Sequence, residues 1–229
     1  MIAMAKKKES TLINMLVALF VITAVSGGVL GLVYGMTKDA IAEVDQKKNE
    51  AAIKAVLPLT GEVTFQADTL RWLDESGKEV LFPCSLALDA NNRLQGAAIK
   101  TSEGGFGGNI DLMVGILADG TIKGVSVLSH SETPGLGANM TGKFKDQFTD
   151  KKPGDNFFLE VTKDHGKEPQ KVDAITAATI TSRAFTKAVD KAYQAFEAAK
   201  AQYNNTPAGQ TVPVTEETNE ITEGGNDHE

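Results

Sequence analysis

The N-terminal part of the chain carries one long stretch without charge. Residues 10–37, between Glu9 and Lys38, contain no Asp, Glu, Lys or Arg, and apolar side chains fill most of the segment. As a helix that rises about 1.5 Å per residue, it would reach about 40 Å, which exceeds the roughly 30 Å hydrocarbon core of a bilayer. The pattern therefore predicts a transmembrane helix over 10–37, preceded by a short N-terminus of residues 1–9.

A cleaved signal peptide is the alternative interpretation of this stretch, with the small residues 24–26 as its cleavage site. The apolar core of a signal peptide spans about 7–15 residues, whereas this run continues past Ser26 to Val33. That length favours an uncleaved anchor. Three lysines at 6–8 come directly before it and place the N-terminus in the cytoplasm by the positive-inside rule, with the rest of the chain across the membrane.

The periodicity changes after the anchor. Residues 38–56 have apolar positions at helical spacing and end before Pro58, which predicts a helix. Alternating or short apolar runs then predict strands at 62–66, 79–82, 94–100, 110–117, 121–129 and 157–162. Asp119-Gly120 between the fourth and fifth of these is a strong hairpin signal. A last amphipathic helix is expected over 182–203. Helix, strands and helix in this order predict an α+β fold with a mainly antiparallel sheet and flanking helices.

Charge and cysteine content exclude several classes of function. The net charge of −7 argues against nucleic acid as a partner, since phosphates require a basic face. A single cysteine, Cys84, rules out an intramolecular disulfide or a cysteine-rich metal centre, and three scattered histidines do not suggest a metal site. Any redox chemistry would have to come from an organic cofactor. Residues 204–229 hold six acidic side chains and no Lys or Arg, which predicts a disordered acidic tail.

A cluster of hydroxyl residues precedes the last predicted helix, in the segment 173–182, DAITAATITS. One interpretation is a plain helix N-cap, with Thr179 or Thr181 as the capping residue. The same geometry also makes an anion site, because the free N–H groups and the positive end of the helix dipole stabilise a phosphate. A phosphodiester on Thr179 would hold its charge there.

Two further segments have both a plain and a functional interpretation. Residues 129–139, SHSETPGLGAN, contain a Pro-Gly turn that needs no function. Residues 104–108, GGFGG, form a loop that lacks the P-loop lysine, although glycine lets backbone approach a planar ligand closely. Phe106 in this loop is a candidate for ligand contact or, equally, for the core.

Taken together, these segments resemble the FMN-binding domain shared by the G subunit of the Rnf complex and the C subunit of the sodium-pumping NADH:quinone reductase. The resemblance runs from the anchor to about Tyr203. It rests on the GGFGG loop, on His-x-Glu-Thr-Pro-Gly-Leu-Gly at 130–137, and on the Asp-x-x-[Ser/Thr]-Gly-Ala-Thr flavinylation motif at 173–179. Residues 38–203 are thus identified as an FMN-binding domain.

The resemblance implies that FMN is the cofactor and that its phosphate is esterified to Thr179, which makes this a phosphoryl-linked threonine. A dedicated flavin transferase makes this bond in the family, with FAD as donor. The implied function is that of an electron-carrying subunit of a membrane-bound, ion-translocating oxidoreductase of the Rnf type, linked to ferredoxin and NAD, and not of an autonomous enzyme. Further flavin-contacting residues are expected at Thr176, Ala178, Thr181, Glu132, Thr133, Gly135, Leu136 and Gly137.

The implied partners are the other membrane and redox subunits of an Rnf-type complex, the flavin transferase during maturation, and the membrane. The implied location is the bacterial inner membrane, with one membrane pass and the soluble domain on the periplasmic side. His130 is expected either to contact the flavin or to form a structural hydrogen bond. The family usually has glycine where this chain has Ala177, so either this position is not left-handed here or the transferase tolerates alanine.

Three other functions remain open on the sequence. The nearest is that of the C subunit of the sodium-translocating quinone reductase, which shares these motifs. A membrane-anchored flavin sensor would be expected to carry additional signalling domains, for which this length leaves no room. A structural envelope protein with coincidental motifs would be colourless when purified from a host that contains the transferase.

Overall fold

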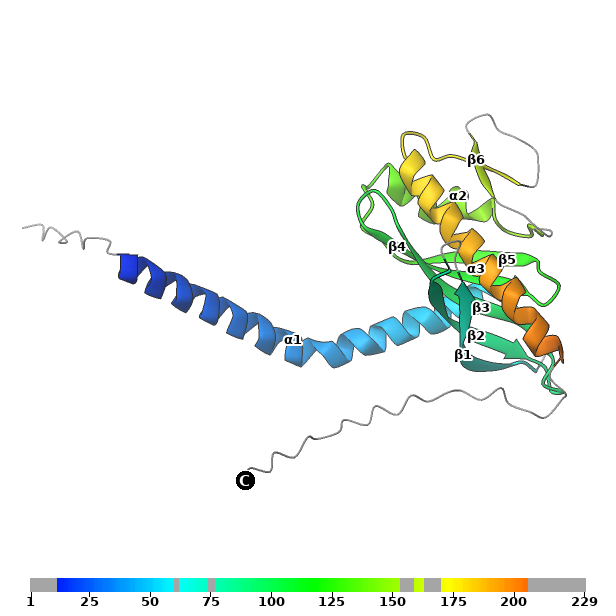
Figure 1. Cartoon of the computed structure of the whole chain (residues 1–229), viewed down its shortest axis with the longest axis horizontal. Coiled ribbons are helices and arrows are strands. Elements are labelled where there is room, and N and C mark those ends of the chain that lie inside the picture. Colours follow the sequence, from blue (N-terminus) through cyan, green and yellow to red (C-terminus); the bar gives the residue numbers. More distant parts are fainter. Residues whose placement is uncertain (1–11, 60–61, 74–76, 153–158, 163–169, 206–229) are drawn as a thin grey trace, which may run out of the picture. The chain divides into compact units, whose positions relative to one another are not determined.

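Five strands form one antiparallel sheet in which each strand pairs with the next along the chain, in the order β1-β2-β3-β4-β5 (Figure 1). The structure is a computed structural model that describes residues 12–59, 62–73, 77–152, 159–162 and 170–205. The strands are β1 (Thr64–Leu73), β2 (Glu79–Leu88), β3 (Leu94–Gly104), β4 (Asn109–Leu117) and β5 (Ile122–Ser129). The expected α+β class with a mainly antiparallel sheet is confirmed.

The predicted hairpin joins β4 to β5. The backbone N–H of Gly120 donates to the Leu117 carbonyl at 2.8 Å, and Gly120 has a φ of +87°. The Asp119 carboxylate accepts the N–H of Thr121 at 2.9 Å. A left-handed glycine beside an aspartate that bonds its own turn explains why Asp-Gly marks this reversal.

The first two strands are longer than the sequence predicts. The predicted segments 62–66 and 79–82 extend in the structure to Leu73 and Leu88. Of the ten residues of β1, only Leu70 is buried, because β1 lies at the edge of the sheet. The apolar alternation that signals a half-buried strand is therefore weak in this part of the sequence.

A second, two-stranded sheet consists of β6 (Glu160–Thr162) and β7 (Lys171–Asp173), which pair in parallel. Residues 157 and 158 of the predicted strand 157–162 lie outside the described residues. Strand β7 was not predicted, since three residues are too few to show a period. It leads directly into the segment 174–178 before the last helix.

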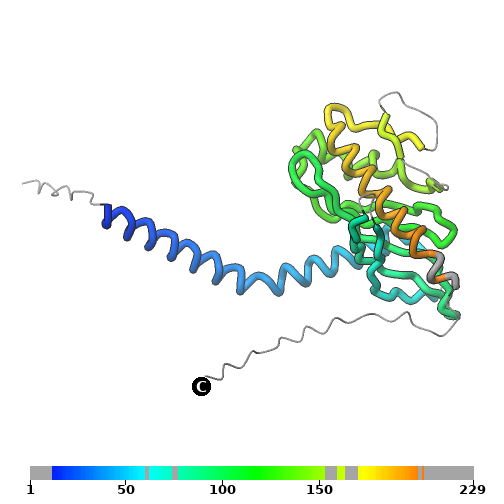
Figure 2. Tube along the Cα trace, in the orientation of Figure 1, coloured from blue at the N-terminus to red at the C-terminus, as the bar shows by residue number. Residues whose placement is uncertain are grey.

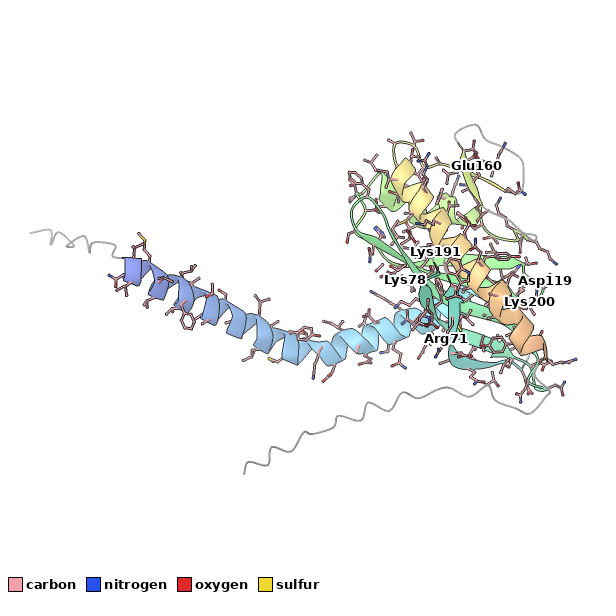
Figure 3. The ribbon with its side chains drawn as sticks, viewed as in Figure 1. Arg71, Lys78, Asp119, Glu160, Lys191 and Lys200 are labelled. Atoms are coloured by element: carbon pink, nitrogen blue, oxygen red, sulfur yellow. The ribbon has the colours of Figure 1, made fainter. Side chains whose placement is uncertain are left out.

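The last helix, α3 (Thr179–Asn205), packs across one face of the sheet (Figure 1). It begins three residues before the predicted start at Ser182. Buried Phe185 and Phe196 on α3 face Ile99, Ile110 and other core residues of the sheet. At the edge of this contact, Glu103 of β3 pairs with Lys187 at 2.9 Å and with Lys191 at 2.5 Å; Figure 3 labels Lys191 on the helix. Two short helical elements complete this layer, η1 (Gly137–Thr141) and α2 (Lys143–Asp146).

Helix α1 runs without a break from Leu12 to Val56, so that the described residues of the predicted segments 10–37 and 38–56 form one helix, and residues 10 and 11 lie outside the described residues. Among the described residues it is the one helix long and apolar enough to cross a membrane, and its apolar side chains from Leu12 to Met36 are exposed. Length and composition alone carry this finding, and a signal sequence would meet the same test. Residues 1–9 and 206–229 of the predicted N-terminus and tail lie outside the described residues; Asn204 and Asn205 belong to α3.

The chain divides into two units, with the boundary between Lys48 and Asn49. The second unit includes the last two turns of α1, which pack on the sheet face opposite α3. Buried Ala52 and Val56 lie there against Ala87, Ala98 and Met113. A cross-strand pair of glycines, Gly115 of β4 and Gly124 of β5, makes the space for Val56. Because both faces of β4 are covered, its sequence reads as a nearly continuous apolar run.

Candidate functional site

A pocket of about 370 Å³ lies where the loop after β3, the segment after β5 and the start of α3 come together. These three segments are far apart in sequence and reach the same end of the sheet (Figure 2). The pocket is lined by Phe106, Glu132, Thr133, Leu136, Gly137, Ala177, Ala178, Thr179, Ile180 and Thr181. The two motifs singled out in the sequence thus line one cavity.

The segment after β5 enters the pocket through a tight turn. The N–H of Leu136 donates to the Thr133 carbonyl at 3.2 Å, with Pro134 second in the turn and Gly135 third. Gly135 has a φ of +79°. Proline followed by a left-handed glycine is the signature of a type II turn. Gly135 therefore shapes the turn and does not line the pocket, whereas Gly137 does.

A similar turn delivers the chain into α3. The N–H of Ala178 donates to the Ile175 carbonyl at 3.0 Å, and Ala177, third in this turn, has a φ of +59°. Ser182 fastens the turn to the helix, because its hydroxyl accepts the Ile175 N–H and donates to the Ala178 carbonyl, each at 2.9 Å. The position where the related motif has glycine is thus left-handed here, and Ala177 occupies a conformation that favours glycine.

We expect Ala177→Gly to raise the free energy of unfolding by about 1 kcal/mol, since alanine at positive φ carries a strain that glycine does not. Denaturant unfolding of the full chain in detergent, followed by the fluorescence of the single tryptophan, Trp72, measures the change. Ala174→Gly is the matched control, because Ala174 lies in the same segment without a positive φ. It should lose stability through chain entropy, and a loss of equal size in both variants would contradict the expected relief.

The hydroxyl groups around the start of α3 differ in what they bind. Thr181 is buried and donates to Glu132 Oε2 at 2.7 Å, and the hydroxyl of buried Ser182 makes the two bonds described above. Thr176 is exposed and lies outside the pocket lining. Thr179 is half-buried and lines the pocket, and its hydroxyl has no hydrogen-bond partner among the described residues. Within the segment 176–182, Thr179 thus presents the one free hydroxyl at the pocket.

The backbone at the same place offers donors for an anion. The Ala178 carbonyl accepts the N–H of Ser182 at 3.0 Å, which is the first bond of the helical ladder. The N–H groups of Thr179, Ile180 and Thr181 precede this bond and therefore have no acceptor within the helix. Together with the helix dipole they favour negative charge at the pocket.

Apolar side chains form the exposed rim of the pocket. Phe106 is 71% exposed, Ile180 56% and Leu136 43%. Phe106 is thus not a core residue, contrary to one of the two roles considered for it. Three large apolar side chains that are exposed around one cavity indicate a site where a ligand or partner binds. The rim suits an apolar, planar ligand.

Glu132 lies at the centre of the site. It is 5% exposed, and its carboxylate accepts the N–H groups of Phe106 and Gly107 as well as the Thr181 hydroxyl. Burial by itself would raise the pKa of Glu132, but the hydrogen bonds from Thr181, Gly107 and Phe106 outweigh it and lower this pKa below its usual value. His130 accepts the backbone N–H of Glu132 at Nδ1, at 3.2 Å, which is the structural role considered for it.

The residues expected at a flavin site therefore separate into two groups. Two of them, Thr176 and Gly135, lie outside the pocket lining. The residues that line it are Thr179, Ala178, Thr181, Glu132, Thr133, Leu136 and Gly137. Phe106, for which the sequence left ligand contact and a core role open, also lines the pocket, and Ala177 and Ile180, which were not among the expected contacts, complete the lining. An isolated phenylalanine between glycines was the available signal for Phe106; Ile180 gave none, since an apolar residue in a helix usually faces the core.

Comparison with known proteins bears directly on this pocket. Residues 105–194 match the model of a family described as the FMN-binding domain, a range that contains every residue of the lining. The chain is 33% identical over 187 residues to the G subunit of the Na(+)-translocating ferredoxin:NAD(+) oxidoreductase complex of Acetobacterium woodii, a match that covers 78% of this chain and 88% of that protein. The chain belongs to the family of G subunits of ion-translocating oxidoreductase complexes, the Rnf family.

Other members of this family show the same extent of similarity. The G subunit of the ion-translocating oxidoreductase complex of Methanosarcina acetivorans is 34% identical over 191 residues, which covers 82% of this chain and 95% of that protein. Among solved structures, the C subunit of the Na(+)-translocating NADH-quinone reductase of Parabacteroides distasonis superposes with a TM-score of 0.50 at 17% identity, over 72% of this chain and 96% of that one. This likeness shows a shared fold.

Proposed function

We propose that this member of the Rnf family is an electron-carrying subunit of an Rnf-type complex, with FMN attached through its phosphate to Thr179. One observation carries the proposal. The free hydroxyl of Thr179 lies at a helix N-terminus, in a pocket with an apolar rim, within the range that matches the FMN-binding domain. Family membership supports the redox role, and the pocket supports the place of the cofactor.

The residues present fit a flavin phosphoester. The N–H groups of Thr179, Ile180 and Thr181 offer hydrogen bonds to a phosphate, and the helix dipole stabilises its remaining charge. With FAD as donor, the Thr179 oxygen would form a bond to phosphorus as the pyrophosphate bond breaks, AMP would leave, and the hydroxyl proton would pass to a base of the transferase. The chain itself offers no base bonded to Thr179 among its described residues, so the transferase would have to supply that base.

The protein's part in the electron transfer is position and environment. FMN supplies one- and two-electron transfer when it is bound. Phe106, Leu136 and Ile180 would cover its apolar ring and limit the access of water, since their exposed side chains surround the pocket. The phosphoester would hold the cofactor at the start of α3, so that its position relative to partner subunits does not depend on free diffusion.

Helix α1 supports a membrane location for this function. Its exposed apolar segment suits a single membrane pass, and the lysines at 6–8 favour a cytoplasmic N-terminus. The flavin domain would then lie on the periplasmic side of the inner membrane. A covalent bond is useful there, because FMN that is lost outside the cytoplasm is not readily replaced. The other membrane and redox subunits of the complex would donate and accept the electrons, and a flavin transferase would load the cofactor.

Mass spectrometry of the tryptic peptide 172–183 tests the attachment in protein from a host that contains a flavin transferase. Cleavage after Lys171 and Arg183 isolates the start of α3 with Thr176, Thr179, Thr181 and Ser182. We expect the peptide to carry the mass of FMN less one water, with fragment ions that assign it to Thr179. An unmodified peptide from the native complex, or the added mass on another hydroxyl, would refute the proposed attachment.

A further inference from the structure

The carboxylate of Glu132 joins two segments that both line the pocket. Oε1 accepts the backbone N–H groups of Phe106 at 2.7 Å and of Gly107 at 3.0 Å, both from the loop after β3. Oε2 accepts the hydroxyl of Thr181, in the first turn of α3, at 2.7 Å. One side chain therefore connects the loop that carries Phe106 with the helix turn that carries Thr179.

Two glycines make room for this carboxylate. A Cβ atom on Gly105 would lie 2.3 Å from Oε1, and a Cβ atom on Gly137 would lie 2.3 Å from Oε2. Neither glycine has a positive φ, so space and not backbone conformation requires glycine at these positions. These glycines, which the sequence suggested for close approach to a ligand, also leave space for Glu132.

The bonds made by Glu132 use both of its oxygens. A buried carboxylate is costly unless donors satisfy it, and here three donors do so. The carboxylate is thus held in place by the protein's own donors, two on Oε1 and one on Oε2. Glu132 thus supports the pocket wall in addition to lining the pocket, where the sequence predicts a ligand contact.

We propose that Glu132 is a positioning residue that fastens the loop 105–108 to the first turn of α3 and thereby holds the Phe106 ring beside the group attached at Thr179. The inference rests on the proposed function, since it assigns Phe106 a ligand to cover. The two backbone bonds flank the Cα of Phe106 on either side, so they fix the direction in which its exposed ring leaves the loop.

Amide hydrogen exchange of the segment 104–108 tests the connection without any need for flavin. Glu132→Gln keeps the length of the side chain and an oxygen acceptor, whereas Glu132→Asp keeps the charge but is one methylene shorter. In the full chain in detergent, we expect exchange in Glu132→Gln to stay within about threefold of the wild type and exchange in Glu132→Asp to be at least about tenfold faster. Gly105→Ala should behave like Glu132→Asp.

Gly104→Ala is the matched control for Gly105→Ala, because a Cβ atom on Gly104 meets no atom within 4 Å. It should leave the exchange rates unchanged. Unfolding followed by Trp72 fluorescence establishes that each variant is folded. Wild-type exchange rates in Glu132→Asp, or equal rates in Gly104→Ala and Gly105→Ala, would overturn the proposed connection.

Iodide quenching of flavin fluorescence tests the consequence for the ligand in flavin-loaded protein. We expect Phe106→Ala and Glu132→Asp each to raise the quenching constant about threefold, and the double variant to raise it no further, because both act through one ring. Unchanged quenching in Phe106→Ala would overturn its covering role, and additive effects would overturn the route through Glu132. Wild-type protein without any flavin would refute the proposed function, while the exchange rates would still decide the connection.

Discussion

Thr179→Val protein is expected to fold and to contain no covalently bound flavin. Valine has nearly the shape of threonine, and the Thr179 hydroxyl has no partner among the described residues, so its removal breaks no bond of the fold. The attachment requires this oxygen, and the expected loss is therefore complete. Flavin fluorescence of the denatured protein on a gel measures it, since denaturation removes any flavin that is not covalently bound.

Thr176→Val is the matched control for this experiment. Thr176 lies three residues earlier in the same motif but is exposed and outside the pocket lining, so this variant should keep the full flavin signal. Thr181→Val should keep covalent flavin as well, although it removes the hydrogen bond to Glu132. Fluorescence of denatured Thr179→Val protein equal to that of the wild type would show that the assignment to Thr179 is wrong.

Gly115→Ala is expected to lower the free energy of unfolding of the second unit by about 2–3 kcal/mol. A Cβ atom on Gly115 would lie 2.2 Å from the backbone carbonyl oxygen of Val56 and 2.6 Å from its carbonyl carbon. These atoms belong to the helix backbone and cannot rotate away as a flexible side chain could. The end of α1 must therefore move off the sheet, and buried Ala52 and Val56 lose contacts.

Gly124→Ala is the control, because it changes the glycine directly opposite in the neighbouring strand. A Cβ atom on Gly124 would lie 3.4 Å from the Val56 Cα, within ordinary van der Waals contact. We expect a loss of less than about 1 kcal/mol for this variant. Denaturant unfolding in detergent, followed by Trp72 fluorescence, measures both, and equal losses would contradict the close approach of Val56 to Gly115.

Glycine is required at different positions of this protein for two different physical reasons, backbone conformation and space. Gly120 and Gly135 have positive φ values and shape turns, which is a local requirement that Asp-Gly and Pro-Gly pairs reveal in the sequence. Gly115 is needed because Val56 approaches it, and Gly137 because the side chains of Glu132 and Thr181 do. No local pattern distinguishes the second kind from a flexible loop residue, since the neighbouring atoms come from elsewhere in the chain.

At Ala177 the local sequence preference and the backbone conformation disagree. From the sequence, a left-handed conformation at this position stayed open, because the related motif has glycine there and alanine disfavours positive φ. In the structure the φ of +59° persists, held by the bond from Ala178 to Ile175 and by the two bonds of Ser182. The surrounding bonds outweigh the preference of one residue.

The sequence alone determined the order of the long helices and of the five strands of the main sheet, the apolar segment of α1, the β4–β5 hairpin and the motifs that define the family. These features depend on neighbours in the chain: uncharged length, a period of two or about 3.6, and turn residues. Only the tertiary structure decided that Phe106 is exposed at a pocket, that Glu132 joins its loop to α3, and that the free hydroxyl of Thr179 lies at that pocket. Those properties arise where segments some 25 to 75 residues apart meet, because burial and hydrogen bonding are set by contacts that no local pattern encodes.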